Sequence, residues 1–295
     1  MLGFLAAMCF VGPRAASARQ AARISANELV SRAVQQQLAN NGAKAHLMYR
    51  LHRVTPDRDE LREILEIDDG SVARVIALKG QPLTSDQQKA EEQRLNHYLK
   101  DPAAWQQRRN RQREDEQRSD RLLAAFPRAF LYSYAGEEPG ANGGSLLRLS
   151  FNPNPAYVAP NRDLRVLEGM QGTMWVDPSV NRIVRLQAKL IRDVEFGWGI
   201  LGRLNSGGSF EIEQRDVGEG RWELVETKLN FEGKELMFKA LHIHETENLS
   251  DFHPVHGHIT LAQGIHMLEE YNPSTDQIAQ QQSNHPAIGA STPPK

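Results

Sequence analysis

Alternating apolar and polar residues run through five segments in the second half of the chain, and several of these segments are separated by short turns. The segments are 170–176, 183–193, 208–214, 222–231 and 235–244. A period of two is typical of strands that bury one face, and tight connections pair such strands antiparallel. The predicted turns are Asp177-Pro178-Ser179, Gly218-Glu219-Gly220 and Glu232-Gly233-Lys234. This succession predicts a curved antiparallel sheet.

Shorter alternating segments occupy the first half of the chain and extend this prediction. They lie at 45–52, 61–67, 72–78, 130–134 and 147–151. Asp68-Asp69-Gly70 joins the second segment to the third, and an Asp-Gly pair tolerates the positive φ angles of a hairpin turn. Thr55-Pro56-Asp57 supplies a turn after the first segment. We therefore expect an antiparallel meander at the start of the domain.

Three segments break the alternation and indicate helices. Ser25-Ala26-Asn27-Glu28 has the spacing of a capping box, and Asn40-Asn41-Gly42 ends the helix that follows. Residues 84–125 form a helical insert, within which Asp101-Pro102 is suited to begin a helix. Residues 260–271 close the domain with a helix that buries Leu261, Ile265 and Leu268. The predicted fold is mainly β with helices (α+β): a curved antiparallel sheet or half-barrel with a covering helix and a helical insert.

The charge balance argues against a nucleic-acid-binding protein. The 295 residues include 35 Lys and Arg against 37 Asp and Glu, so the formal net charge is only −2. Within the insert, a run of arginines is followed closely by acidic residues, which nearly cancel it. The two sets are Arg108, Arg109, Arg111 and Arg113, then Glu114, Asp115, Glu116 and Asp120. This pattern favours a solvated helix with internal ion pairs.

Residues 1–18 have the pattern of a signal peptide. Met1 to Val11 is a short apolar run, and Ala16-Ser17-Ala18 fits a cleavage site. We expect a periplasmic or secreted protein, with a single domain at 19–271 and a disordered tail at 272–295. The sole cysteine, Cys9, lies in the leader, so the mature chain would have neither a catalytic thiol nor a disulfide. A buried N-terminal helix and lipid attachment at Cys9 are the alternatives.

Two pairs of segments carry a resemblance to a known group of proteins. Met174-Trp175-Val176-Asp177 followed by Ile183-Val184-Arg185-Leu186 resembles the periplasmic lipoprotein-carrier superfamily, the half-barrels of outer-membrane lipoprotein sorting. Residues 169–177 and 196–202 are similar to a family of exported bacterial proteins in that group, and the likeness covers most of residues 25–271. The resemblance implies a concave apolar face that could hold an acyl chain. The helical insert is not part of the carriers' usual pattern, so the resemblance supports the half-barrel fold more strongly than the carrier function.

From this resemblance we expect a non-catalytic envelope protein that binds or carries a lipid, an acyl group or a hydrophobic peptide. The alternative is an envelope interaction module that docks a protein partner through the insert or the convex face of the sheet. No transmembrane segment is expected in the mature chain. The residues expected to line the cavity are Leu47, Tyr49, Phe130, Tyr132, Leu149, Met174, Trp175 and Trp198.

Signals for an enzyme are weak. No G-x-S-x-G segment occurs, so a serine hydrolase has no signature here. His242 and His244 lie two apart on one predicted strand, and His256 is the third weak candidate for a metal ligand. No carboxylate is evidently paired with them. We therefore expect no metal, no cofactor and no enzymatic activity, and a histidine-dependent metal hydrolase is the least favoured hypothesis.

Overall fold

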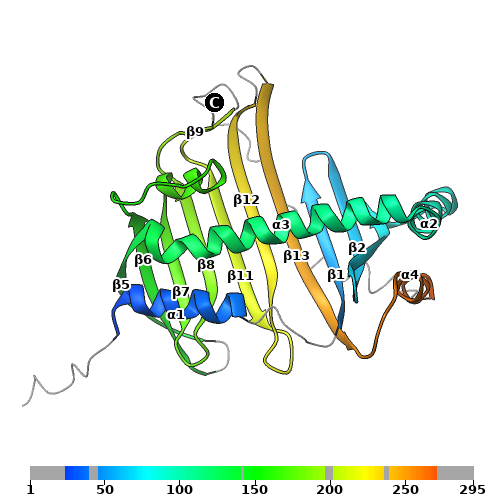
Figure 1. Ribbon diagram of the computed structural model, residues 1–295, viewed down its shortest axis with the longest axis horizontal. Helices are drawn as coiled ribbons and strands as arrows, with labels where there is room; N and C mark the ends of the chain where they lie inside the picture. Colours follow the sequence, from blue (N-terminus) through cyan, green and yellow to red (C-terminus); the bar gives the residue numbers. More distant parts are fainter. Residues whose placement is uncertain (1–23, 40–45, 141–142, 197–201, 236–238, 271–295) are drawn as a thin grey trace, which may run out of the picture.

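One antiparallel sheet contains all the strands that the structure describes (Figure 1). The computed structural model describes residues 24–39, 46–140, 143–196, 202–235 and 239–270. The strands run in the order β4-β3-β2-β1-β13-β12-β11-β8-β7-β6-β5, and β10 and β9 branch from β12. In the described part of the chain the outer strands β4 and β5 do not pair, so the sheet is not closed into a barrel. The predicted fold class, mainly antiparallel β with helices, is confirmed.

The longer strands coincide with predicted segments, but β13 extends eleven residues beyond the predicted end at 244, and the short strands β4, β9 and β10 were not predicted. In the first half they are β1 (His46–Thr55), β2 (Arg58–Ile67), β3 (Gly70–Leu78), β4 (Gln81–Pro82), β5 (Phe130–Pro139) and β6 (Ser145–Pro153). In the second half they are β7 (Met170–Asp177), β8 (Arg182–Leu190), β9 (Val194–Phe196), β10 (Gly202–Leu204), β11 (Ser209–Asp216), β12 (Trp222–Glu235) and β13 (Lys239–Val255). The turn predicted at Glu232-Gly233-Lys234 is wrong, because these residues continue β12 and pair with β13.

The helices begin at the predicted caps. They are α1 (Ala26–Ala39), α2 (Ser85–Lys100), α3 (Pro102–Ala129) and α4 (Leu261–Glu270), with a 3-10 helix, η1 (Asp163–Gly169). The Ser25 hydroxyl accepts a hydrogen bond from the Glu28 N–H at 3.1 Å. The Asp101 carboxylate accepts from the N–H groups of Ala103 and Ala104. No described helix is long and apolar enough to cross a membrane. The predicted leader at 1–18 and tail at 272–295 lie outside the described residues.

α1 and α3 cross the same face of the sheet, which we call the covered face (Figure 1). α1 buries an apolar stripe that recurs at helical spacing, and α3 adds the small residues of its last turns. Under them lie the inward residues of β5 to β8, including Leu149 and Met174, which are fully buried. The members of this core from α1 and α3 are Ala26, Leu29, Val30, Ala33, Val34, Ala125 and Ala129.

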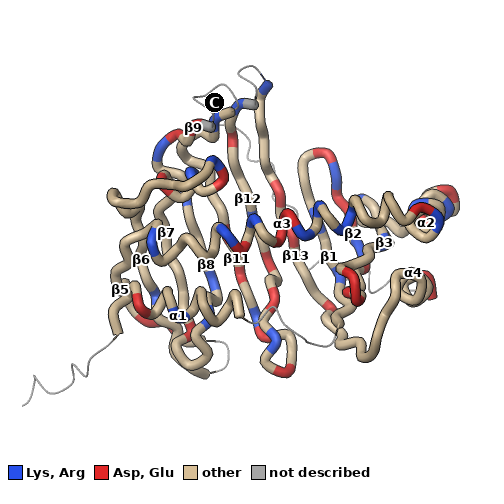
Figure 2. The backbone as a smooth tube through the Cα atoms, in the orientation of Figure 1, with Lys and Arg blue, Asp and Glu red and all other residues tan. Residues whose placement is uncertain are grey.

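The middle of α3 differs from its two ends. Trp105 anchors the first turn against Leu95 and Tyr98, and the last turns pack into the core under α1. Between these anchors no apolar residue occurs from position 106 to position 120. We call residues 106–120 the strap. Figure 2 shows its charged residues passing over the sheet from β2 toward β8.

Near β1 to β3 the sheet packs its apolar residues on the other side, which we call the opposite face. Side chains alternate along β2, so Leu65 and Ile67 point away from the strap. They pack with α4, which buries Ile265 and Leu268. Gly264 of α4 permits this close approach, because a Cβ there would lie 2.8 Å from the Ile67 side chain.

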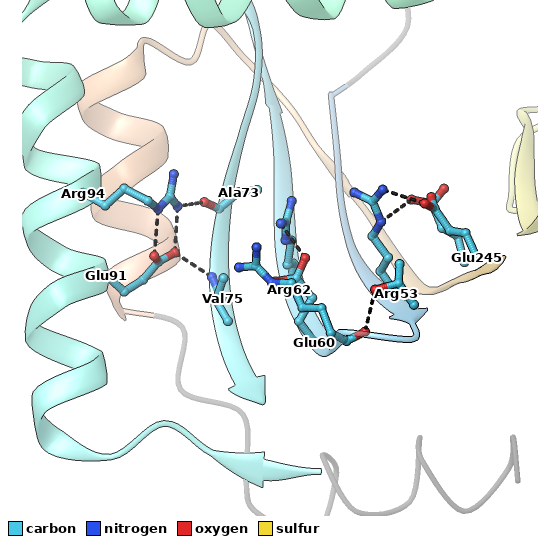
Figure 3. A network of polar contacts seen from close by, with 11 residues as sticks. Arg53, Glu60, Arg62, Ala73, Val75, Glu91, Arg94 and Glu245 are labelled. Atoms are coloured by element: carbon cyan, nitrogen blue, oxygen red, sulfur yellow. Dashed lines mark hydrogen bonds and ion pairs between the residues drawn. The ribbon is translucent and has the colours of Figure 1, made fainter. Parts of the chain in front are cut away.

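α2 covers the outer edge of β3 with polar groups. The Glu91 carboxylate accepts a hydrogen bond from the Val75 N–H at 2.7 Å, and Arg94 donates to the Ala73 carbonyl at 2.6 Å. Glu91 and Arg94 are themselves paired at 2.7 Å (Figure 3). Backbone groups on a sheet edge otherwise invite pairing with another strand. The two side chains therefore close this edge where the short β4 does not reach it.

Candidate functional site

Four of the eight residues predicted to line a cavity lie in the core beneath α1 and α3. They are Phe130, Tyr132, Leu149 and Met174, each at most 9% exposed. The Phe130 ring lies 4.7 Å from the Phe151 ring, measured between centroids. The Tyr132 hydroxyl donates a hydrogen bond to the Phe126 carbonyl at 3.0 Å. These side chains fill the space between the sheet and the two helices, and their role as ligand contacts stays a prediction.

Two more of the predicted residues lie on β1, away from that core. Leu47 is buried, and its N–H donates to the Glu66 carboxylate at 2.9 Å. The Tyr49 ring stacks on Phe252 at 5.4 Å. Burial is the main cause that raises the pKa of the Tyr49 hydroxyl above its usual range, and the carboxylate of Glu66 adds to it. Tyr49 therefore stays neutral.

The two predicted tryptophans are placed differently. Trp175 neighbours the core residue Met174 on β7, so its side chain points to the opposite face. It is 7% exposed and lies under the Arg185 guanidinium, 5.1 Å from the ring centroid. Trp198 lies outside the described residues. The eight predicted residues therefore do not converge on one site in the described part of the chain.

A cleft of about 1250 Å³ lies between the strap and the covered face of the sheet. The strap supplies one wall with charged groups of both signs, and residues of β1, β2, β3, β8, β11, β12 and β13 line the other wall. The apolar side chains of this cleft are Leu51, Trp222 and Leu224, and Leu224 is 40% exposed. Its charged residues on the strap are Arg108, Arg111, Asp115, Glu116 and Asp120. The strap is therefore the wall of a cleft as well as a solvated helix.

Polar contacts hold the strap above the sheet. Arg109 pairs with Asp69 in the β2–β3 turn at 2.8 Å, and Gln112 accepts hydrogen bonds from Ser71 at 3.3 Å. Arg108 has no such carboxylate partner among the described residues, and its guanidinium lies 5.9 Å from the centre of the Tyr98 ring. Burial lowers the pKa of Arg108. Solvent-accessible polar contacts of this kind stabilise a structure only weakly.

Several cations of the cleft are already neutralised by carboxylates. Arg221 binds both oxygens of Glu66 at 2.8 Å and one oxygen of Glu223 at 2.6 Å. Arg53 pairs with Glu245 at 2.7 Å (Figure 3). Short charge-assisted hydrogen bonds of this kind leave little free charge on either partner. These residues form a rigid polar wall.

Arg182 differs from the other cations of the cleft. It is 3% exposed and lines the cleft, yet its side chain has no hydrogen bond or ion pair with any residue that the structure describes. Burial lowers its pKa, and the charge of Glu223 only partly offsets this effect. Gln214 is 4% exposed in the same cleft, and its side-chain amide likewise has no described partner. Because both side chains line the cleft without a described partner, this end of the cleft is suited to receive an anionic acceptor.

The two neighbouring histidines of β13 lie on the opposite face, together with an acid that sequence reasoning missed. The Glu232 carboxylate is hydrogen-bonded to His244 Nε2 at 2.7 Å and is paired with His242 Nδ1. The hydrogen bond from His244 is the main cause that lowers the pKa of Glu232. His256 follows the other end of β13, far along the strand from this cluster.

A further buried pair lies on the opposite face of β1 and β2. Arg50 and Glu63 are each 2% exposed, and their nearest charged atoms are 3.7 Å apart. Arg50 also pairs with Asp251 at 2.8 Å. Burial is the main cause that raises the pKa of Glu63 to about 7. This pair does not line the cleft.

Sequence reasoning missed the two residues that mark the cleft most clearly. Arg182 lies between a predicted turn at 177–179 and a predicted strand at 183–193, where an arginine is normally solvated, and Gln214 ends a predicted strand. Neither position shows its burial in the sequence. The strap itself gave a usable signal, because a long helix without apolar residues must bridge between packed parts or remain solvated.

Comparisons with known proteins add little to this geometry. No protein-family model matches the chain, and no curated protein matches it. Among solved structures, the chain is similar to a DUF1329 family protein from Desulfovibrio piger, with a TM-score of 0.28 and 9% sequence identity. The similar part covers 80% of this chain and 95% of that one. A likeness this distant supports no functional argument.

Proposed function

We propose that this protein is an exported, non-catalytic binding protein that holds an amphiphilic ligand in the cleft beneath the strap. The ligand is a lipid or another acyl-bearing molecule with an oxyanion in its head group. Arg182 is the observation that carries this proposal, because its guanidinium lines the cleft without a partner among the described residues and can pair there with an anion from outside.

The rest of the cleft suits such a molecule. Leu51, Trp222 and Leu224 provide apolar surface for part of an acyl chain. Gln214 offers an amide that can donate to the same oxyanion as Arg182. The carboxylates on Arg221 are already engaged, so they repel a second anion less than free carboxylates would.

Lipid extraction and mass spectrometry of protein purified from its native compartment test the proposal directly. We expect an acidic amphiphile in about one copy per chain, and N-terminal sequencing of the same sample should begin at Arg19 if cleavage follows Ala18. Protein that carries no lipid after mild purification would count against the proposed function.

Binding assays with defined ligands then locate the site. We expect Arg182→Gln to weaken dodecyl phosphate binding by about 1.5–3 kcal/mol, roughly 10- to 150-fold, because a hydrogen-bonded charge pair is lost. Arg185→Gln is the matched control, since Arg185 lies on the same strand but belongs to the opposite face beside Trp175. If both variants bind dodecyl phosphate with equal affinity, the ligand binds outside this cleft.

A further inference from the structure

The strands β12 and β13 bring three potential metal ligands together at the end of the sheet that lies at the top of Figure 1. In the antiparallel register Glu232 lies directly across from His242, and His244 follows two residues later on the same face. Phe231 and Ile243 pack toward the core, so these three side chains point to the opposite face. The site is therefore separate from the cleft beneath the strap.

We infer that Glu232, His242 and His244 form a binding site for a divalent transition-metal ion, and that Zn²⁺ is the ion that best fits the donor set. One donor atom from each side chain lies within 4.8 Å of the other two. Tetrahedral zinc with bonds near 2 Å holds its donors about 3.3 Å apart. Small side-chain rotations at these positions bring the donors to that spacing.

The surroundings allow such rotations and leave room for a further ligand. The side chains of Glu232, His242 and His244 are 45%, 59% and 42% exposed. Two imidazoles and one carboxylate are the protein donors of several zinc sites that keep the fourth position open for water or another ligand. The imidazole rings lie nearly parallel, with an interplanar angle of 16° and a centroid distance of 6.4 Å. Both rings can thus turn a nitrogen toward one ion beside Glu232.

A contribution to folding stability does not explain why the side chains of Glu232, His242 and His244 converge. Exposed ion pairs contribute about 0–1 kcal/mol, and one histidine would suffice to pair with the carboxylate. Metal binding uses all three donors at once, and it ties β12 to β13 close to the end of both strands. The inference does not depend on the ligand proposed for the cleft.

The test uses chelator-treated, full-length mature protein without a polyhistidine tag. Isothermal titration with Zn²⁺ should give one ion per chain, and Co²⁺ should give the intense visible absorption of a four-coordinate site. Zn²⁺ should also raise the melting temperature of the wild type, because it binds only the folded state tightly. His242→Ala, His244→Ala and Glu232→Gln should each weaken binding by at least about 100-fold.

His256→Ala is the matched control, because this exposed histidine lies beyond the other end of β13. It should bind Zn²⁺ as the wild type does. Circular dichroism and the metal-free melting temperature verify that each variant is folded. The inference is overturned if the wild type binds no Zn²⁺, or if binding persists unchanged in folded Glu232→Gln and His242→Ala proteins.

Discussion

The two ends of the sheet bury their apolar residues on different sides. At β5 to β8 the apolar side chains face α1 and α3, whereas at β2 and β3 those of Leu65, Ile67 and Val72 face α4. α3 crosses both regions, so its last turns rest on a core while its middle lies over charged strands. The comparison shows why a cleft forms where it does: the helix loses its apolar support where the sheet's apolar side changes face.

Truncation of a core aromatic should have the largest effect, and it tests whether the β5–β8 end is packed rather than hollow. We expect Phe130→Ala to lower the free energy of unfolding by about 3–5 kcal/mol, because it leaves a cavity under α3. Chemical denaturation measures the change. Leu131→Ala is the control, since Leu131 is 52% exposed, and its effect should be small. A tolerant Phe130→Ala protein would indicate a ligand cavity at this end after all.

Removal of the Glu91 carboxylate, which covers the edge of β3, should have the next largest effect, at the β1–β3 end. Glu91→Ala leaves the Val75 N–H and the Arg94 guanidinium without their carboxylate partner, at a cost of about 2 kcal/mol. Thermal unfolding of the variant measures this loss. Glu92→Ala changes an exposed neighbour on the same helix and should leave the melting temperature nearly unchanged.

The buried Glu63 should make the stability of the β1–β3 end depend on pH. Its folded-state pKa of about 7 lies above the ordinary value of 4.5, so the folded protein retains a proton that the unfolded chain releases. The stabilising contribution is therefore complete below pH 4.5 and is lost as the pH rises through about 7. Glu63→Gln should remove this decline in urea denaturation at pH 4 to 8. If the free energy of unfolding of Glu63→Gln declines with pH as that of the wild type does, other groups cause the decline.

The smallest effect is expected in the cleft between the two ends, and its sign is opposite. Arg182→Met replaces a buried, unpaired charge with an apolar side chain of similar length, so ligand-free protein should gain about 1 kcal/mol of stability. Arg185→Met, on the same strand, should show no such gain, because Arg185 is 39% exposed beside Trp175. Destabilisation by Arg182→Met would show that Arg182 supports the fold.

Local patterns predicted the elements of this fold well. The Asp-Gly hairpin at 68–70 and the Asp101-Pro102 helix start both occur as expected, because each depends on backbone preferences within a few residues. The failure at Glu232-Gly233-Lys234 has a physical reason. Gly233 reads as a turn residue, but here it allows β10 to approach, since a Cβ would lie 2.1 Å from the Arg203 carbonyl oxygen.

The candidate site was much harder to predict than the strands. Arg182 lines one cleft with the strap, which is distant in sequence and contributes no apolar signal of its own. Glu232 meets His242 only through the register of a long hairpin, and a shift of one residue would place them on different faces. Such sites depend on long-range pairing, which local periodicity does not contain.

The polar contacts that hold the strap on the sheet affect how fast a ligand can enter the cleft. Lifting residues 106–120 would break the Arg109–Asp69 pair and the Gln112–Ser71 hydrogen bonds, while Trp105 and Ala125 could stay in their clusters. The Asp69 side chain is 61% exposed, so dissolved salt screens this attraction. Association rates should therefore rise with ionic strength where strap opening limits them. That response is opposite to the one expected for simple attraction of an anion to a cationic surface.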